Sequence, residues 1–231
     1  MDTYTEALEQ VMNKLHDNFD QTNDQNIREL NNFIFYIDLL EQICNSIEKS
    51  ISKDVLSEAQ SDLVSSLIFC FQGYYRQANI CLRSSIELIL SFLYYYDHQY
   101  DFILWKNDCM DMTWTQLTNS DKGVFNNSFL SIVHGKKVDV SKCLEKIKEL
   151  YHLTSQYVHG KYSYMQKNLN DRIQYSSELV DAYFKTSEEI IKLEIIMLYI
   201  RFNGSIVSCL DLNDISRIDN FVKEYEVIRN E

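Results

Sequence analysis

The chain contains no proline, and this absence restricts the folds open to it more than any other feature of the sequence. Average usage of about 5% would place roughly 12 prolines in a chain of this length. Glycine is also scarce, at five residues. Because proline and glycine form most tight turns and linkers, a β-rich fold or a string of domains would lack its usual turn residues. We therefore expect an all-α, single-domain helical bundle over residues 1–231, with about six to eight helices.

Apolar residues recur at helical spacing along most of the chain. This periodicity predicts flanking helices within 3–51 and 173–228 and further helices over about 54–73, 74–97 and 141–158. The segment Tyr74–Asp97 is apolar around most of its circumference, so we expect it at the centre of the bundle. Between His98 and Val140 the pattern weakens and predicts only short helices, near 101–106 and 125–132.

Several polar residues and glycines stand where helices could begin or end. Asp54, Ser141 and Asp214 can each cap a helix at its amino terminus. Gly160 can end a helix in the left-handed conformation, and the last long helix is expected to end near Asn203–Gly204.

The six cysteines are widely spaced and form no C-x-x-C or cysteine–histidine pair of the kind that binds zinc. Most of them fall among apolar residues. We expect free, buried thiols, no metal and no cofactor.

Charge and hydropathy bear on where the protein works and what it binds. The amino-terminal residues have neither the basic nor the apolar segment of a secretion signal. The most apolar stretches, Leu88–Tyr96 and Ile190–Ile200, are too short to cross a bilayer or are broken by Lys192 and Glu194, which favours buried helices in a cytoplasmic protein without membrane contact. The net charge of −12 disfavours broad RNA binding and suits a basic protein partner.

A polar stripe interrupts the otherwise apolar segment Tyr74–Asp97. At about 100° per residue, Arg76, Arg83 and Glu87 fall within roughly 40° of one another, and Asn79 lies beside them. Arg83 and Glu87 stand at positions i and i+4 and can pair. Three interpretations stay open: a solvent-facing surface pair, an internal structural pair, or a functional site.

His159 is the second candidate functional feature. It stands at the end of the predicted helix 141–158, where the helix dipole favours the protonated imidazole. Ser155 and Tyr151 precede it at intervals of four residues and share its face. A histidine at this position can also be an ordinary helix terminus.

Two segments resemble the HEPN group of bacterial helical proteins. Gly73-Tyr74-Tyr75-Arg76-Gln77-Ala78, leading into Leu82-Arg83-Ser84-Ser85-Ile86-Glu87, is similar to the central HEPN helix, and Leu150–Gly160 is similar to the matching late helix. The segment Tyr96–Tyr100 with Trp105 also suits uncharacterised members. The resemblance covers about residues 55–165 and marks them as a HEPN-like core.

The resemblance implies a helical bundle, frequently homodimeric, with a role in bacterial antiviral defence or a toxin system. Active members resemble metal-independent ribonucleases in which four to six residues separate an arginine from a following histidine near the dimer cleft. Here His152, Leu153 and Thr154 occupy the positions where that arginine would precede His159. Arg83 or Arg76 could take the place of the missing arginine only if the fold brings one of them close to His159.

Three functions follow as hypotheses. The first is a non-catalytic or degenerate HEPN-like module that binds itself or a partner. The second is a metal-independent endoribonuclease in which His159 moves protons and Arg83 offsets phosphate charge. Glu87 would orient either His159 or Arg83. The supporting residues would be Arg76, Asn79, Tyr151 and Ser155. The third is a sensor of a small ligand or nucleotide, because sixteen tyrosines and a polar stripe could line a pocket.

Overall fold

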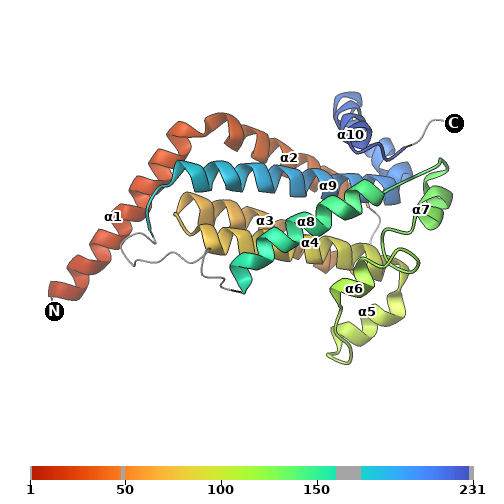
Figure 1. Ribbon diagram of the computed structural model, residues 1–231, viewed down its shortest axis with the longest axis horizontal. Coiled ribbons are helices and arrows are strands. Elements are labelled where there is room, and N and C mark those ends of the chain that lie inside the picture. The colour runs from red at the N-terminus through yellow and green to blue at the C-terminus, as the bar shows by residue number, and fades with distance from the viewer. Residues whose placement is uncertain (1, 48–49, 160–172, 229–231) are drawn as a thin grey trace.

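The computed structural model describes residues 2–47, 50–159 and 173–228, and the secondary structure there is helical (Figure 1). Ten helices form in this described part, more than the six to eight expected. In chain order they are α1 Asp2–Gln25, α2 Ile27–Ser46, α3 Lys53–Phe71, α4 Tyr75–Asp97, α5 Gln99–Lys106, α6 Trp114–Leu117, α7 Asn127–His134, α8 Ser141–Val158, α9 Ser177–Cys209 and α10 Leu212–Glu224. The expected all-α class is confirmed.

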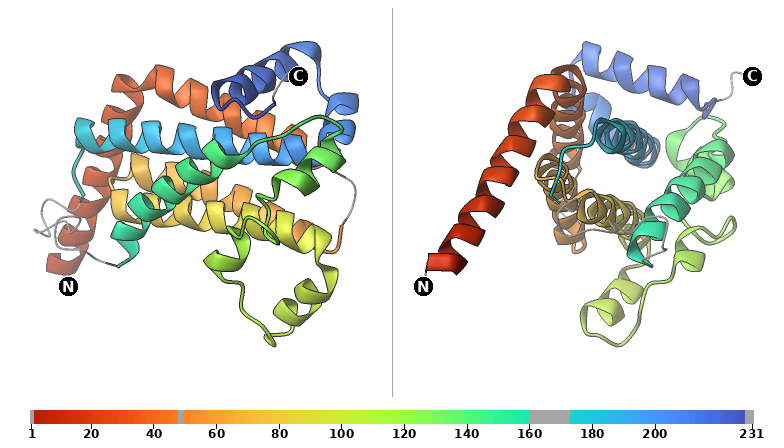
Figure 2. Two further views of the ribbon diagram at one scale, coloured as in Figure 1. Left: turned by 45° about the vertical axis from the view of Figure 1, so that its right-hand side comes forward. Right: turned by 60° about the vertical axis from the view of Figure 1, so that its left-hand side comes forward.

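The two central helices are α4 and α9. Helix α4 packs against α3, α8 and α9, while α9 also packs against α2, α7 and α10. Figure 2 shows α9 surrounded by these neighbours, and α8 crosses the front of α4 in Figure 1. The central position predicted for the segment Tyr74–Asp97 is therefore confirmed.

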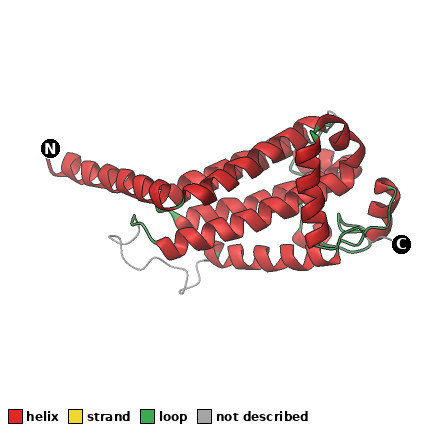
Figure 3. Ribbon diagram, turned by 90° about the horizontal axis from the view of Figure 1, so that it is seen from above, coloured by secondary structure: helices red, strands yellow, loops and turns green. Residues whose placement is uncertain are grey.

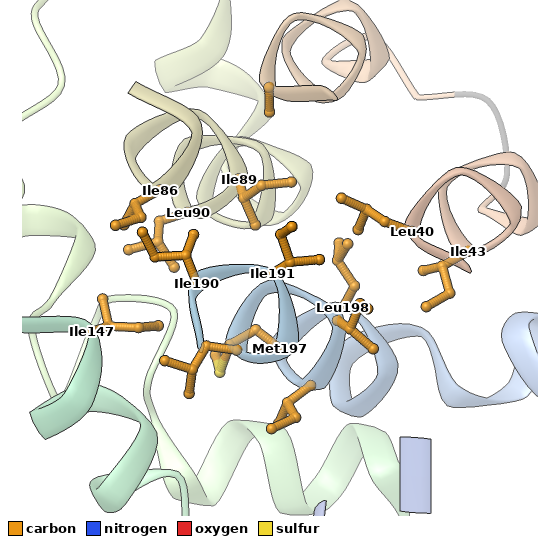
Figure 4. Close-up of a cluster of buried hydrophobic side chains, with 14 of the residues drawn as sticks. Leu40, Ile43, Ile86, Ile89, Leu90, Ile147, Ile190, Ile191, Met197 and Leu198 are labelled. Carbon is orange, nitrogen blue, oxygen red and sulfur yellow. The ribbon is translucent and has the colours of Figure 1, made fainter. Parts of the chain in front are cut away.

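The core lies where α2, α4, α8 and α9 meet. Ile89 and Leu90 of α4 face Ile190 and Ile191 of α9, and Ile147 of α8 closes one side (Figure 4). One continuous cluster of buried apolar side chains extends from Phe33 to Val227. Burying apolar surface contributes a free energy of about 25 cal/mol per Å², and this is the main stabilising term in such a core.

The three predicted caps differ from the ones that form. Asp211, rather than Asp214, precedes α10 and accepts hydrogen bonds from the backbone N–H groups of Asn213 and Asp214 at 2.8 and 2.9 Å. Asp54 and Ser141 lie inside α3 and α8, whose N-cap positions carry no side-chain cap. The cap must precede the first helical residue, and packing starts these helices earlier than their polar residues suggest.

Two helix ends also differ from the prediction. Helix α2 ends at Ser46 rather than near residue 51. Helix α9 extends to Cys209, but two helical segments meet at a kink at Phe202 (φ −120°, ψ 27°), directly before the predicted end at Asn203–Gly204. Phe202 itself is buried against Phe92, so the kink lies in the packed part of the bundle. Gly160 lies outside the described residues.

The segment between α4 and α8 contains the helix that the sequence pattern missed. Thr113 and Gln116 form a capping box around α6, with Thr113 Oγ1 accepting from the Gln116 N–H and Gln116 Oε1 accepting from the Thr113 N–H. This four-residue helix carries Trp114 toward α8. It is too short to show apolar periodicity.

All six cysteines are free, as expected. Cys44, Cys70 and Cys143 are buried, whereas Cys109 and Cys209 are exposed. Within residues 2–47, 50–159 and 173–228, no helix is both long and apolar enough to cross a bilayer.

Candidate functional site

The interface of α4 and α8 gathers four of the predicted site residues. Along it, Arg83 of α4 meets Ser155 of α8, and Glu87 one turn later meets Tyr151 one turn earlier. The two helices therefore contact each other with opposite chain directions. The spacing i, i+4 on each helix places both pairs on facing surfaces.

Arg83 makes four hydrogen bonds to side chains in this cluster. Nη1 and Nη2 donate to the two carboxylate oxygens of Glu87 at 2.9 and 3.0 Å. Nε donates to Ser155 Oγ at 3.1 Å, and Nη2 also donates to the Tyr151 hydroxyl. The side chains of Arg83 and Glu87 are 22% and 34% exposed. The pair is thus half-buried and bidentate, which combines the favourable fork geometry with partial shielding from water.

Tyr151 links the two charged residues. Its hydroxyl donates to Glu87 Oε1 at 2.8 Å while it accepts from Arg83. Burial, followed by the hydrogen bond to Glu87, raises the pKa of Tyr151. The phenol therefore stays protonated at neutral pH and keeps its donor role.

Trp114 completes the cluster and was missed by the sequence interpretation. Its ring stacks on Tyr151 with centroids 3.6 Å apart and planes at 9°. The signal that could have found it is the capping-box pattern Thr113-x-x-Gln116 around it. We refer to Arg83, Glu87, Tyr151, Ser155 and Trp114 as the Arg83 cluster.

Arg76 lies further along the same interface and performs a different task. Its Nε donates to the carbonyl of Tyr157 at 2.9 Å and its Nη2 to that of Val158 at 3.4 Å. These carbonyls belong to the last turn of α8, where basic side chains commonly bind the backbone acceptors of a helix. Arg76 therefore caps the carboxyl end of α8.

The remaining two predicted residues stay outside the cluster. Asn79 is buried and donates to the carbonyl of Tyr75 in its own helix at 2.8 Å. His159 is exposed, and its backbone N–H donates to Ser155 O at 3.1 Å. Among the described residues, the His159 imidazole makes no hydrogen bond or ion pair with Arg83 or Glu87. The structure therefore joins Arg83 to Glu87 but does not bond either of them to His159.

A separate pocket of about 560 Å³ lies near the carboxyl end of α4, between α7 and α9. Apolar surface predominates in its lining, which also includes the charged side chains of Asp97, Asp121, Lys122 and Arg201. Its lining residues are Leu93, Tyr94, Asp97, His98, Asp121, Lys122, Gly123, Val124, Asn126, Phe129, Leu130, Met197 and Arg201. No residue of the Arg83 cluster is among them.

The Arg83 cluster and the pocket offer a ligand polar contacts and apolar surface. Over the described ranges, no three histidine, cysteine, aspartate or glutamate side chains come together as a set that could hold a metal ion. The Arg83 cluster offers a bidentate arginine whose donors meet protein acceptors, and the pocket offers a mostly apolar, partly open volume. Comparison of the chain with family models, with curated proteins and with solved structures found no match.

Proposed function

We propose that this chain is a non-catalytic, HEPN-like helical module that acts by self-association and partner binding in a bacterial defence or toxin-type system. The kind of system comes from the sequence resemblance alone. The observation that supports the absence of catalysis is the closed Arg83 cluster, in which the arginine binds Glu87, Tyr151 and Ser155.

A catalytic arginine must direct its N–H groups to the place where phosphate charge develops. Arginine has five N–H donors, and the four hydrogen bonds of Arg83 all end on protein oxygens. The Glu87 carboxylate already balances its charge. A phosphate would have to displace Glu87 and leave a half-buried carboxylate without its partner, which is costly. The cluster is better suited to holding α4 and α8 in register.

The amino-terminal half of α1 supplies a surface for self-association. It projects beyond the rest of the bundle, as Figure 3 shows. Tyr4, Leu8 and Val11 are 88%, 63% and 36% exposed, and Leu15 follows at the same spacing. We refer to these four residues as the α1 stripe. Their intervals of four, three and four residues match the alternating spacing of a coiled-coil seam.

A second copy of α1 is the occupant that this stripe fits best. Two identical stripes with coiled-coil spacing are complementary to each other, so one interface can bury both. Exposed apolar patches on monomers of this size usually mark such association sites. The acidic surface left outside the dimer, with a net charge of −12 per chain, would then attract a basic partner.

Incubation with single-stranded RNA in the presence of a chelator tests the non-catalytic assignment. We expect the wild-type protein to leave the RNA intact, and Arg83→Ala to lower the melting temperature. The chelator binds metal ions and so inactivates trace metal-dependent nucleases in the assay. His159→Ala is the matched control, because His159 is exposed and its replacement should leave the melting temperature unchanged.

The opposite result would support the ribonuclease hypothesis. Cleavage that persists in chelator and disappears in His159→Ala, with an unchanged melting temperature, would contradict a non-catalytic module. Under that outcome Arg83→Ala should also abolish cleavage.

A further inference from the structure

The pocket near the end of α4 combines residues from four parts of the chain. Leu93 and Tyr94 come from α4, Val124 from the loop before α7, Phe129 from α7 and Met197 from α9. A volume of about 560 Å³ lies within the range of pockets that hold small molecules, roughly 300 to 1,000 Å³. An apolar wall with few polar groups is the usual composition of such sites.

The charges around this pocket cancel. Arg201 forms a two-pronged ion pair with Asp97, through Nε at 3.2 Å and through Nη2. The other two charged lining residues, Asp121 and Lys122, are adjacent and of opposite sign. A lining with two acids and two bases has no net attraction for a charged ligand, so it favours an uncharged one.

Aromatic side chains give the pocket a flat surface. The guanidinium of Arg201 lies over the ring of Phe129 at 5.4 Å and over that of Phe202 at 5.0 Å. Phe129 is still 38% exposed. On the α4 side, His98 stacks on Tyr94 with centroids 4.0 Å apart and planes at 4°. Tyr94 is only 9% exposed, so Phe129 supplies the uncovered ring on which a planar aromatic group can stack.

Two polar groups can set the orientation of a ligand. The ion pair with Asp97 uses Nε and Nη2 of Arg201, and among the described residues the N–H groups of Nη1 are left for a ligand acceptor. His98 Nδ1 lies 2.9 Å from the carbonyl oxygen of Tyr94. Because a carbonyl can only accept, Nδ1 is the donor in this contact, and Nε2 is the ring nitrogen outside it.

We propose that this pocket binds an uncharged, planar aromatic molecule of about two fused rings that carries a carbonyl or carboxamide. The rings would lie against Phe129, and the carbonyl would accept from Arg201. A nucleotide suits the site less well, because the one charge of Lys122 is offset by Asp121 and cannot balance a phosphate. This site is independent of the module proposed above, since it uses no residue of the Arg83 cluster or the α1 stripe.

Three probes of nearly equal shape and different charge test the proposal. Naphthamide is neutral, naphthoate is an anion and naphthylmethylamine is a cation at neutral pH. We expect isothermal titration with the full-length protein to show saturable binding of naphthamide, at least tenfold tighter than that of the other two. Adenosine monophosphate is the fourth arm and should bind more weakly than naphthamide.

Substitutions within α7 locate the binding site. Phe129→Ala should weaken naphthamide binding by about tenfold, since it removes the stacking surface. Ile132→Ala is the matched control, because Ile132 is 81% exposed on the same helix and does not line the pocket. Both residues are exposed, so neither change should unfold the protein, and a melting curve checks this.

The proposal is overturned if naphthamide shows no saturable binding up to its solubility limit. It is also overturned if either charged probe or the nucleotide binds as tightly as naphthamide. An equal loss of binding in Phe129→Ala and Ile132→Ala would place the bound probe elsewhere and would overturn it as well.

Discussion

The hydroxyl of Ser85 on α4 donates a 2.6 Å hydrogen bond to Glu194 Oε1 on α9, in the middle of the apolar core. Glu194 is 3% exposed, and within the described part of the chain its second oxygen has no hydrogen-bond partner. Ile86, Leu90 and Met197 are among its apolar neighbours. Burial raises the pKa of Glu194 from 4.5 to about 8, so the folded protein holds this carboxyl in its protonated form at neutral pH.

The stability of the protein should therefore fall as pH rises. The folded state keeps a proton that the unfolded chain releases above about pH 4.5. The contribution of the protonated carboxyl is complete below that value and is lost as pH rises through about 8. Glu194→Gln cannot lose a proton, so its melting temperature should exceed that of the wild type by a margin that grows between about pH 5 and about pH 9.

Glu178→Gln is the control for this experiment, because Glu178 is exposed in the first turn of the same helix. Its melting curve should follow that of the wild type at every pH. Parallel pH profiles for Glu194→Gln and the wild type would show that Glu194 is not the group responsible.

Loss of Arg83 should destabilise the protein by about 1 to 3 kcal/mol, less than a fully buried pair would cost, because Glu87 is partly hydrated. For a domain of this size that corresponds to a fall in melting temperature of roughly 2 to 4 °C per kcal/mol. Arg83→Lys should recover only part of the loss, since an ammonium cannot bind Glu87 through two parallel N–H groups. Arg28→Ala, at an exposed position on α2, should have no measurable effect.

A double-mutant cycle with Glu87→Gln separates the pair from its neighbours. We expect a coupling energy of about 1 kcal/mol between Arg83 and Glu87, measured by urea unfolding. Additive effects of the two substitutions would mean that the contacts to Tyr151 and Ser155 hold Arg83 in place without Glu87.

The α1 stripe should determine the oligomeric state. Light scattering is expected to give twice the chain mass at micromolar concentration, and Leu8→Lys with Val11→Lys should give the mass of one chain. Both residues are exposed, so their replacement should cost little folding stability. Asn13→Lys adds one positive charge on the opposite face of α1 and should leave the dimer intact. A monomeric wild type at high concentration would refute self-association through this stripe.

Two of the six thiols should react rapidly in the native protein. Cys109 and Cys209 are exposed, whereas burial raises the pKa of Cys44 and Cys143 to about 12 and also raises that of Cys70. The thiolate is the reactive form, so the buried thiols should resist alkylation until the protein unfolds. Mass spectrometry after brief iodoacetamide treatment should find label on Cys109 and Cys209. Label on Cys70 without unfolding would contradict the packing described here.

The sequence determined the class of fold and the most local part of the candidate site. Missing proline and scarce glycine exclude most turn-rich folds, and apolar periodicity locates the long helices. The bond between Arg83 and Glu87 follows from spacing alone, because residues four apart on a helix are neighbours. The spacing of the α1 stripe is also visible in the sequence, but its exposure to solvent is known only from the structure.

The tertiary structure decided which polar residues are buried and which segments meet. The sequence interpretation treated Lys192 and Glu194 alike, as breaks in an apolar stretch. In the fold, Lys192 pairs with Glu188 at 2.6 Å near the surface, whereas Glu194 enters the core beside Ser85. Residues two apart on a helix point about 200° from each other, so only the neighbouring helices decide which one is covered.

The same reason applies to the rest of the site and to the pocket. Tyr151 and Ser155 reach Arg83, and Trp114 reaches Tyr151, from parts of the chain more than 30 residues away, through the packing of α4 against α8 and α6. The pocket likewise needs α4, α7, α9 and a loop to be placed together. Helical spacing relates residues within one element, but the contacts between elements depend on how their apolar faces pack.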